Sequence, residues 1–331
     1  MDSTHHTTAT LPNFDGVVDA GNRVAGFAIE TPLLEYPVLN ERCGGRVLLK
    51  AENLQRTGSF KFRGAWNCLS AQAEQARENG VVAWSSGNHA QGVALAARML
   101  GAKAAIVMPA DAPATKIGRT RALGAELVLY DRYRDDREAL GRRLAAERNA
   151  VLVPSYDDPL VIAGQGTMGL EIVKQCQARR VIPDTALICC GGGGLTSGAS
   201  LAMHEHFSRL HVHTVEPSGF DDTARSLASG QRVGNEAGSR SICDALLSPT
   251  PGSLTWPILK HHVVSGLVVT DDDALSAMRF AFTELKLVLE PGGAVALAAV
   301  LSGRYDVSGK TVVVVLSGGN VDPALVTESV A

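Results

Sequence analysis

The chain has 331 residues, of which 45% are hydrophobic and 20% are charged, a composition that suits a globular protein of one large or two smaller domains. Its net charge is −3, and the basic residues form no stripe with interleaved aromatics, which argues against a nucleic-acid partner. No apolar run is long enough to cross a bilayer, so a membrane protein is excluded.

The N-terminal residues 1–22 are polar and aperiodic, so we expect them to form a disordered tail. They contain neither the basic region nor the apolar stretch of a signal peptide. The six cysteines show no CxxC pair and no zinc-ligand spacing. Reduced thiols and a cytoplasmic protein are therefore expected.

From residue 23 onward, short β-rich runs alternate with longer helical stretches. Strands are predicted over residues 81–84, 104–108, 126–130, 151–153, 186–190, 212–215 and 311–316. Helices are predicted over residues 88–100, 114–123, 135–148, 195–206 and 272–287. This alternation predicts an α/β fold in which parallel, twisted sheets carry helices on both faces. The number of strand–helix units is too large for one sheet, so two domains are expected.

Four consecutive glycines, Gly191, Gly192, Gly193 and Gly194, follow one predicted strand and precede a helix. Without Cβ atoms, the free backbone N–H groups of such a turn can surround an anion. The segment has the spacing of neither a dinucleotide fingerprint nor a Walker A loop, which argues against a nicotinamide-dependent oxidoreductase. It therefore predicts a cup for a single phosphate, with a tight turn that binds nothing as the alternative.

Lys61 has aromatic neighbours in the sequence Ser59-Phe60-Lys61-Phe62 and no acidic partner nearby. A lysine in an apolar, partly desolvated setting has a lowered pKa and can attack a carbonyl carbon. A solvated surface lysine is the alternative. The phosphate cup and the polar strand ends elsewhere in the chain favour the reactive lysine.

Two further strand ends carry polar side chains. The segment Ser85-Ser86-Gly87-Asn88-His89 offers hydroxyls, an amide and helix N–H groups, which together could hold a substrate carboxylate. The alternative is an ordinary helix cap made by Ser86 or Asn88. Ser317 ends the last predicted strand, where its hydroxyl could meet a ring nitrogen.

The motifs S-F-K-x-R-G, S-S-G-N-H-x-Q, G-G-G-G-L and S-G-G-N, in this order, resemble the fold-type-II pyridoxal phosphate enzymes of the serine/threonine dehydratase and serine racemase group. The resemblance covers residues 31–320. It implies a two-domain fold like that of the tryptophan synthase β subunit, with a large cofactor-binding domain of residues 23–80 and 154–331 and a small domain of residues 81–153. It also implies a homodimer.

The resemblance assigns roles to individual residues. Lys61 would bind pyridoxal phosphate as a Schiff base and take the substrate's Cα proton. The residues that would contact the cofactor are Phe60, Lys61, Asn88, Gly191, Gly192, Gly193, Gly194, Leu195 and Ser317. Those that would contact the substrate are Ser85, Ser86, Asn88, His89 and Arg137. Ser86 matches a serine that acts as an acid and base in the racemase branch, whereas Arg137 equally fits a charged helix face.

A third group of residues resembles the divalent-cation site of this family. Glu216 and Asp222 would supply carboxylates and Phe220 its backbone carbonyl, a set of hard oxygen ligands that suits Mg²⁺ or Ca²⁺, with Mn²⁺ also admitted. The alternative is a strand end followed by an acidic helix cap.

The resemblance implies a dehydratase (ammonia-lyase) that converts L-serine, L-threonine or a related 3-hydroxy amino acid to a 2-oxo acid and ammonia by β-elimination. Serine racemisation and dehydration of L-threo-3-hydroxyaspartate are the alternatives. A serine at position 317 cannot hold a pyridinium as a carboxylate would, which favours elimination. Because the sequence ends soon after Asn320, no C-terminal regulatory domain is expected.

Overall fold

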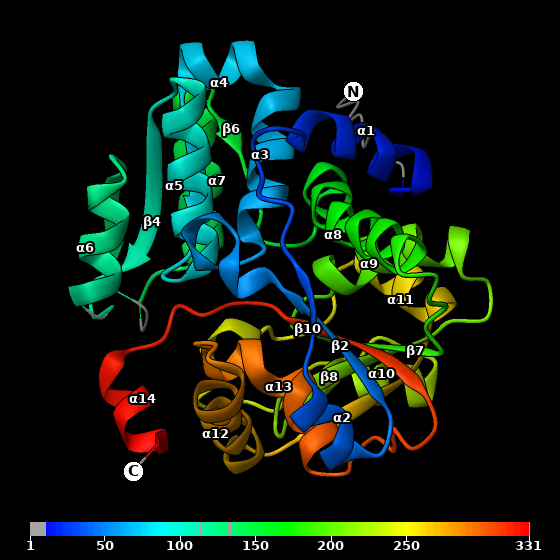
Figure 1. The fold of residues 1–331 in the computed structure, drawn as a ribbon. Helices are drawn as coiled ribbons and strands as arrows, with labels where there is room; N and C mark the ends of the chain where they lie inside the picture. Colours follow the sequence, from blue (N-terminus) through cyan, green and yellow to red (C-terminus); the bar gives the residue numbers. More distant parts are fainter. Residues whose placement is uncertain (1–10, 113, 132–133, 331) are drawn as a thin grey trace.

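The computed structural model describes residues 11–112, 114–131 and 134–330. Two sheets form its framework (Figure 1). The larger sheet has the strand order β1 (Leu33–Glu35), β2 (Arg46–Ala51), β10 (Thr311–Leu316), β7 (Thr185–Cys189), β8 (His211–Pro217) and β9 (Val263–Val269). The smaller sheet has the order β5 (Glu126–Tyr130), β4 (Ala104–Pro109), β3 (Val81–Trp84) and β6 (Val151–Leu152).

All neighbouring strands are parallel except β1, which pairs antiparallel to β2 at one edge of the larger sheet. The predicted α/β class is therefore confirmed, and the expectation of purely parallel sheets is wrong for this edge strand. The antiparallel pairing fits its place in the chain, because β1 has only the short helix α2 (Pro37–Cys43) before β2.

Helices surround the sheets. Those packed near the smaller sheet are α3 (Lys61–Ala71), α4 (Ala73–Asn79), α5 (Asn88–Leu100), α6 (Ala114–Ala122) and α7 (Arg137–Arg148). The others are α1 (Phe14–Val24), α8 (Pro159–Ala178), α9 (Gly194–His206), α10 (Asp222–Ser229), α11 (Thr255–His262), α12 (Asp271–Phe280), α13 (Pro291–Leu301) and α14 (Pro323–Val330). In Figure 1, α8 and α9 lie on one side of the larger sheet, and α12 and α13 lie on the other.

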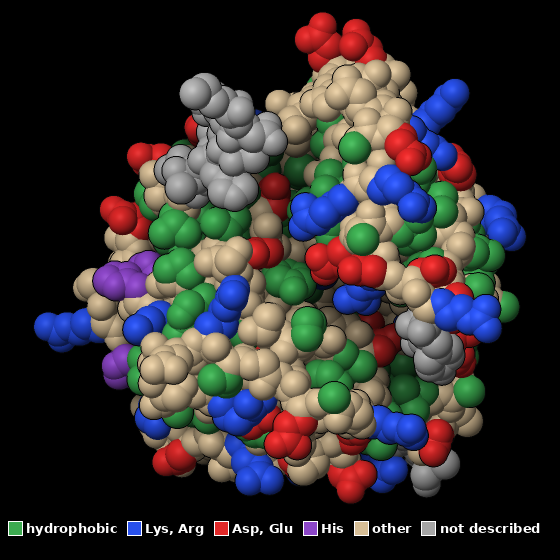
Figure 2. Space-filling model, turned by 180° about the vertical axis from the view of Figure 1, so that it is seen from behind, with side chains coloured by type: hydrophobic (Ala, Val, Ile, Leu, Met, Phe, Trp, Pro, Cys, Tyr) green, Lys and Arg blue, Asp and Glu red, His purple; other side chains and the backbone are tan. Residues whose placement is uncertain are grey.

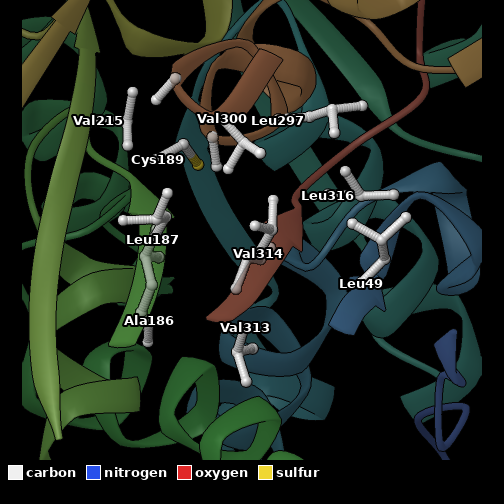
Figure 3. Close-up of a cluster of buried hydrophobic side chains, with 14 of the residues drawn as sticks. Leu49, Ala186, Leu187, Cys189, Val215, Leu297, Val300, Val313, Val314 and Leu316 are labelled. Atoms are coloured by element: carbon white, nitrogen blue, oxygen red, sulfur yellow. The ribbon is translucent and has the colours of Figure 1, made fainter. Parts of the chain in front are cut away.

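The core of the larger sheet explains its parallel strands. Strand β10 has the sequence Thr-Val-Val-Val-Val-Leu and is buried on both faces, as a central parallel strand requires. Figure 3 shows Val314 of β10 and Leu187 of β7 together with Leu297 of α13 in this core. The smaller sheet is likewise covered on both faces, because Val81 packs in the cluster that includes α5 while Val82 packs with Ala145 of α7.

The predicted disordered tail is wrong for residues 14–22, because they belong to helix α1. Val17, Ala20 and Val24 recur at helical spacing and are buried, and the side chain of Asn13 caps the helix by accepting a hydrogen bond from the N–H of Gly16. Residues 1–10 lie outside the described residues. The apolar residues of this helix do recur at helical spacing, so the interpretation of the segment as aperiodic is wrong.

Several element boundaries differ from the sequence prediction by one or two residues, and two helix ends show the physical cause. Helix α7 begins at Arg137 rather than at residue 135, because the carboxylate of Asp136 caps it. The helix predicted over residues 272–287 is α12 followed by one π-helical turn, Ala281–Leu285, and it ends because Lys286 adopts a left-handed backbone conformation with φ of 59°.

The predicted division into two domains agrees with the membership of the strands, since every strand between residues 81 and 153 lies in the smaller sheet. Helix α3 nevertheless shares a hydrophobic cluster with α5 and α8 through Phe62, Trp66, Val93 and Val161. The boundary at residue 80 therefore separates helices that have a common core, and the division itself stays a prediction.

The surface mixes charges of both signs. Figure 2 shows acidic and basic side chains interspersed over the back of the molecule, with hydrophobic side chains exposed between them. Among the described helices, none combines the length and the apolar character that crossing a membrane requires.

Candidate active site

One pocket collects side chains from strand ends of both sheets. The predicted site residues that line it are Phe60, Lys61, Ser85, Ser86, Asn88, His89, Arg137, Gly191, Gly192, Gly193, Gly194, Leu195 and Ser317. They come together because the carboxyl ends of β3, β7 and β10 face this space, the usual place for ligands in parallel α/β folds. The predicted cation residues Glu216, Phe220 and Asp222 do not line the pocket.

Lys61 is the first residue of α3, and its ammonium donates a hydrogen bond of 2.7 Å to the carbonyl oxygen of Ser155. The Nζ atom also lies 5.1 Å from the centre of the Phe60 ring. Burial lowers the pKa of Lys61 to about 8. A larger fraction of this amine is therefore neutral and nucleophilic near neutral pH than in an ordinary lysine.

The glycine segment joins β7 to α9, which begins at Gly194. Gly193 has a backbone φ of 93°, a conformation that residues other than glycine rarely adopt. A Cβ atom on Gly192 would lie 2.3 Å from ring carbons of Tyr156, so no side chain fits there. The first N–H groups of α9 have no partner within the helix and face the pocket as an anion site.

Asn88, the first residue of α5, is held by two other side chains. Its Nδ2 donates to Oε1 of Glu290 over 2.6 Å, and its Oδ1 accepts from Nδ2 of Asn320 over 2.8 Å. One N–H of the amide remains for a ligand. The helix cap is Gly87 without a side-chain hydrogen bond, so the interpretation of Ser86 or Asn88 as an ordinary cap is wrong.

Glu290 is a functional candidate that the sequence did not reveal. Its carboxyl is buried beside the pocket, and burial raises its pKa to about 8. A Cβ atom on Gly318 would lie 1.9 Å from Oε1 of Glu290, so this glycine makes the room that the carboxyl occupies. In the sequence, a single glutamate before Pro291 reads as a helix start, and only its isolation between two apolar runs could have drawn attention.

His89 lies beside the pocket with one ring nitrogen already engaged. Its Nε2 is 2.8 Å from the carbonyl oxygen of Val153, and burial lowers its pKa to about 3, so the ring is neutral. The proton is therefore on Nε2, and the buried Nδ1 has no hydrogen-bond partner in the described part of the chain. The Ser85 hydroxyl accepts a hydrogen bond from the N–H of Gly87, whereas the Ser86 hydroxyl makes no such bond within the described residues.

Ser317 directly follows β10 and is 4% exposed. Its side chain lies within hydrogen-bonding reach of the buried thiol of Cys189, the last residue of β7, which also lines the pocket. Burial raises the pKa of Cys189 to about 11, so both groups are neutral at physiological pH. A ring nitrogen placed here would meet neutral hydrogen-bonding groups only.

Another part of the pocket lining is not indicated by the sequence. It includes Tyr156, whose ring packs against Gly192, and the short helix Asp244–Leu246, whose Asp244 forms an ion pair with Lys116 of α6. Arg137, the first residue of α7, also lines the pocket, and its side chain is exposed. These contacts join residues far apart in sequence, so no local pattern indicates them.

The predicted cation residues form a separate buried acid pair. Glu216 is the second-last residue of β8, and its carboxylate accepts backbone hydrogen bonds from Thr223 (2.9 Å) and Ala224 (2.8 Å) at the start of α10. Oδ1 of Asp222 accepts a hydrogen bond of 2.6 Å from Nδ2 of Asn235, while its buried Oδ2 has no hydrogen-bond partner in the described residues. Burial and mutual repulsion raise the pKa of Glu216 to about 8, and burial raises that of Asp222 to about 6.

A divalent cation would satisfy these two acids. Among the described residues, no three acidic, histidine or cysteine side chains converge on one point, so the carbonyl oxygen of Phe220 and water would have to complete its ligands. The interpretation of Asp221 or Asp222 as a simple helix cap is not supported, because Asp221 at the cap position makes no side-chain capping bond.

The acid pair predicts an unusual dependence of stability on pH. Folded Glu216 keeps its proton up to a pH of about 8, whereas in the unfolded chain it loses the proton near 4.5. Stability is therefore full below the unfolded value and falls as pH rises toward 8, by at most about 1.4 kcal/mol per pH unit. In EDTA, we expect Glu216→Gln to make the fall in unfolding free energy between pH 5 and 8 shallower, as measured by urea unfolding.

The matched control is Glu236→Gln, an exposed carboxyl in the following loop, which should leave the slope unchanged. Glu290 also has a raised pKa, so the slope is reduced rather than abolished in Glu216→Gln. Equal slopes in the wild type and Glu216→Gln would show that Glu216 does not carry this proton.

Comparison with known proteins identifies the family. Residues 24–318 match the model described as pyridoxal-phosphate dependent enzyme. An L-threo-3-hydroxyaspartate ammonia-lyase of Pseudomonas sp is 43% identical over 94% of this chain and 96% of its own, and an L-threonine ammonia-lyase of Thermotoga maritima is 40% identical over 93% and 75%. The structure of maize serine racemase superposes with a TM-score of 0.90 at 34% identity over 97% of both chains. The resemblance inferred from the motifs is confirmed: the chain belongs to the family of pyridoxal-phosphate-dependent enzymes.

Proposed function

We propose that the chain is an ammonia-lyase that converts a 3-hydroxy amino acid, such as L-serine, L-threonine or L-threo-3-hydroxyaspartate, to a 2-oxo acid and ammonia. The observation that carries the proposal is the enclosed Lys61 amine, which shares one pocket with the glycine cup and Ser317. Relatives named as ammonia-lyases align over nearly the whole chain, which supports the same reaction class.

The residues of the pocket fit pyridoxal phosphate. Gly192 packs against the ring of Tyr156 with no room for a Cβ atom, and the N-terminus of α9 presents N–H groups from Gly194 and Leu195 to a phosphate. Asn88 has one N–H free for a phenolic oxygen, and Ser317 offers a neutral hydroxyl to the pyridine nitrogen. When bound, the cofactor supplies the electron sink for bond cleavage at the substrate Cα.

The chain's own groups then perform the proton transfers and the orientation. Lys61, with its lowered pKa, holds the cofactor and takes the Cα proton as the general base. The hydroxyls of Ser85 and Ser86, with the N-terminus of α5, bind the substrate carboxylate. Ser86 could also serve as the second acid and base of a racemase, and the likeness to maize serine racemase makes racemisation the second candidate activity.

We also propose that a divalent cation, Mg²⁺, Ca²⁺ or Mn²⁺, binds at Glu216, Asp222 and the backbone carbonyl of Phe220. The unpartnered, buried Oδ2 of Asp222 supports this site, as do the raised pKa values of both acids. A homodimer, which the family resemblance implies, is part of the same proposal. The cytoplasmic location stays a prediction.

The decisive test is product formation by the purified protein loaded with pyridoxal phosphate. We expect 2-oxo acid and ammonia from L-threo-3-hydroxyaspartate, L-serine or L-threonine, with D-serine assayed in parallel. Arg137 lines the pocket together with Lys116, so its guanidinium could bind the side-chain carboxylate of hydroxyaspartate. Arg137→Met should therefore lower kcat/KM for hydroxyaspartate about tenfold, as loss of a charged hydrogen bond does, and change that for L-serine far less.

Arg134→Met serves as the control, since Arg134 is an exposed arginine just before α7 that does not line the pocket. Absence of oxo acid from all three substrates would overturn the lyase proposal. An equal loss of kcat/KM for hydroxyaspartate and L-serine in Arg137→Met would leave the lyase proposal standing but would show that Arg137 does not bind the second carboxylate.

A further inference from the structure

The side chain of Asn235 lies between the acid pair and the wall of the pocket. Its Nδ2 donates one hydrogen bond of 2.6 Å to Oδ1 of Asp222 and another of 2.8 Å to the backbone carbonyl of Ser248. An amide NH₂ group has two hydrogens, so both are in use, one in each direction. Asn235 thus contacts both an acid of the pair and a residue of the pocket.

The remaining polar atoms of Asn235 fix the orientation of this amide. Its Oδ1 accepts a hydrogen bond of 2.7 Å from Nη2 of Arg225, and its backbone N–H donates one of 2.9 Å to the carbonyl oxygen of Pro249. A flipped amide would place Oδ1 against two acceptors and Nδ2 against a guanidinium donor. The amide therefore has one favourable orientation.

Ser248 and Pro249 belong to the pocket wall, which we define as residues 244–249. This wall packs directly on the phosphate cup, because a Cβ atom on Gly191 would lie 3.2 Å from Oγ of Ser248 and 3.3 Å from Cα of Leu246. The position of the wall thus sets the space beside the first glycine of the cup.

The two oxygens of Asp222 have separate tasks. Oδ1 accepts the hydrogen bond of Asn235, and the buried Oδ2 remains for a cation. Glu216 differs, because its carboxylate accepts its hydrogen bonds from the backbone N–H groups of Thr223 and Ala224 in α10. Asp222 is therefore the acid through which a bound cation could act on the wall.

We propose that Asn235 is a positioning residue through which a divalent cation at Glu216 and Asp222 fixes the pocket wall. The inference rests on the proposed function, since it takes up both the cation site and the lyase reaction. A bound cation holds the Asp222 carboxylate in place, and this carboxylate accepts a charge-assisted hydrogen bond from Asn235. The same amide holds the Ser248 carbonyl. Without the cation, the buried Oδ2 of Asp222 has no partner among the described residues, so the hydrogen bond from Asn235 to Oδ1 holds this carboxylate alone and the pocket wall is less firmly fixed.

The test separates cation binding from its effect on the substrate. Wild-type holoenzyme and Asn235→Ala are compared in EDTA and in MgCl₂ or CaCl₂, with two readouts: the thermal unfolding midpoint and KM in the lyase assay. In the wild type we expect the cation to raise the midpoint and to lower KM about tenfold. In Asn235→Ala the midpoint should still rise, because the ligands remain, while the effect of the cation on KM falls to less than about twofold.

Two further variants complete the experiment. Gln231→Ala removes an exposed amide from the same loop and should behave as the wild type. Asn235→Asp keeps the size of the side chain and an acceptor for Arg225 but loses the N–H donor. It should show the same uncoupling, which protects the test against a poorly folded alanine variant.

Each outcome is decisive. A tenfold cation effect on KM that persists in both Asn235 variants overturns the proposal. Loss of the midpoint shift together with the KM effect also overturns it, because Asn235 would then merely build the cation site. If the cation changes neither quantity in the wild type, the cation site and this proposal fail together, while oxo acid formation still tests the lyase reaction separately.

Discussion

Replacing Lys61 with alanine is expected to lower turnover by at least about 10³-fold, because the variant loses both the attachment of the cofactor and the general base. The other lysine that lines the pocket, Lys116, is already paired with Asp244, so it is not a ready substitute. The fold should persist, since the lost amine is one whose burial costs free energy, as its lowered pKa shows. Steady-state kinetics and the visible absorbance of the holoenzyme measure the two effects.

Borohydride reduction followed by peptide mapping identifies the attached lysine. In the wild type the adduct should lie on the peptide that contains Lys61, and Lys61→Ala should yield none. The control is Lys103→Ala, an exposed lysine before β4, which should keep both turnover and absorbance. A stable lysine adduct in Lys61→Ala would move the attachment to another residue and remove the central assignment.

The position of the candidate site could be predicted because it depends on local sequence and on one rule of topology. Gly191, Ser85 and Ser317 each follow a run of apolar residues that reads as a buried strand. Parallel strands bring their carboxyl ends to one edge, so polar residues at those ends meet. The pocket confirms this placement for all three.

The rest of the site could not be predicted because it depends on contacts between distant residues. Glu290 reaches Asn88 across 202 positions of the chain, and Lys116 reaches Asp244 across 128. A single acidic or amide residue in a loop has many possible partners, and sequence alone does not select one. Asn235 is an example, since its role appears only when Asp222 and Ser248 are placed on either side of it.

The fold shows the same division. Strand β10 and helix α5 agree with the sequence prediction, whereas the long helix α8 and the apolar helix α13, both largely buried, were not predicted. Helix α1 buries only Val17, Ala20 and Val24, and the short edge strand β1 offers three residues of signal. Elements held mainly by packing against distant helices leave little trace in their own sequence.

A methyl group at position 192 is expected to weaken cofactor binding about tenfold to a hundredfold, the range that overpacking of a tight site produces. The Cβ atom of Gly192→Ala would lie 2.3 Å from Cδ2 and Cε2 of Tyr156 and 2.4 Å from Cγ. The methyl group would overlap one edge of the Tyr156 ring, including Cγ, the ring atom bonded to Cβ. Because Cγ lies on the axis about which the ring rotates, a small rotation of the ring does not relieve the contact. The carbonyl of Gly192 also accepts a 2.7 Å hydrogen bond from Oγ1 of Thr255, which restrains the loop from moving away.

Titration of the apoprotein with pyridoxal phosphate, followed by visible absorbance, gives the dissociation constant that tests this prediction. Gly118→Ala is the matched control, because this glycine lies in α6 with nothing within 4 Å of the added Cβ atom, and it should bind the cofactor as the wild type does. A second variant, Gly192→Ala combined with Tyr156→Ala, removes the ring that the methyl group meets. If steric overlap is the cause, the double variant should bind the cofactor more tightly than Gly192→Ala alone; unchanged or weaker binding would mean that the glycine is required for another reason, such as the approach of the phosphate itself.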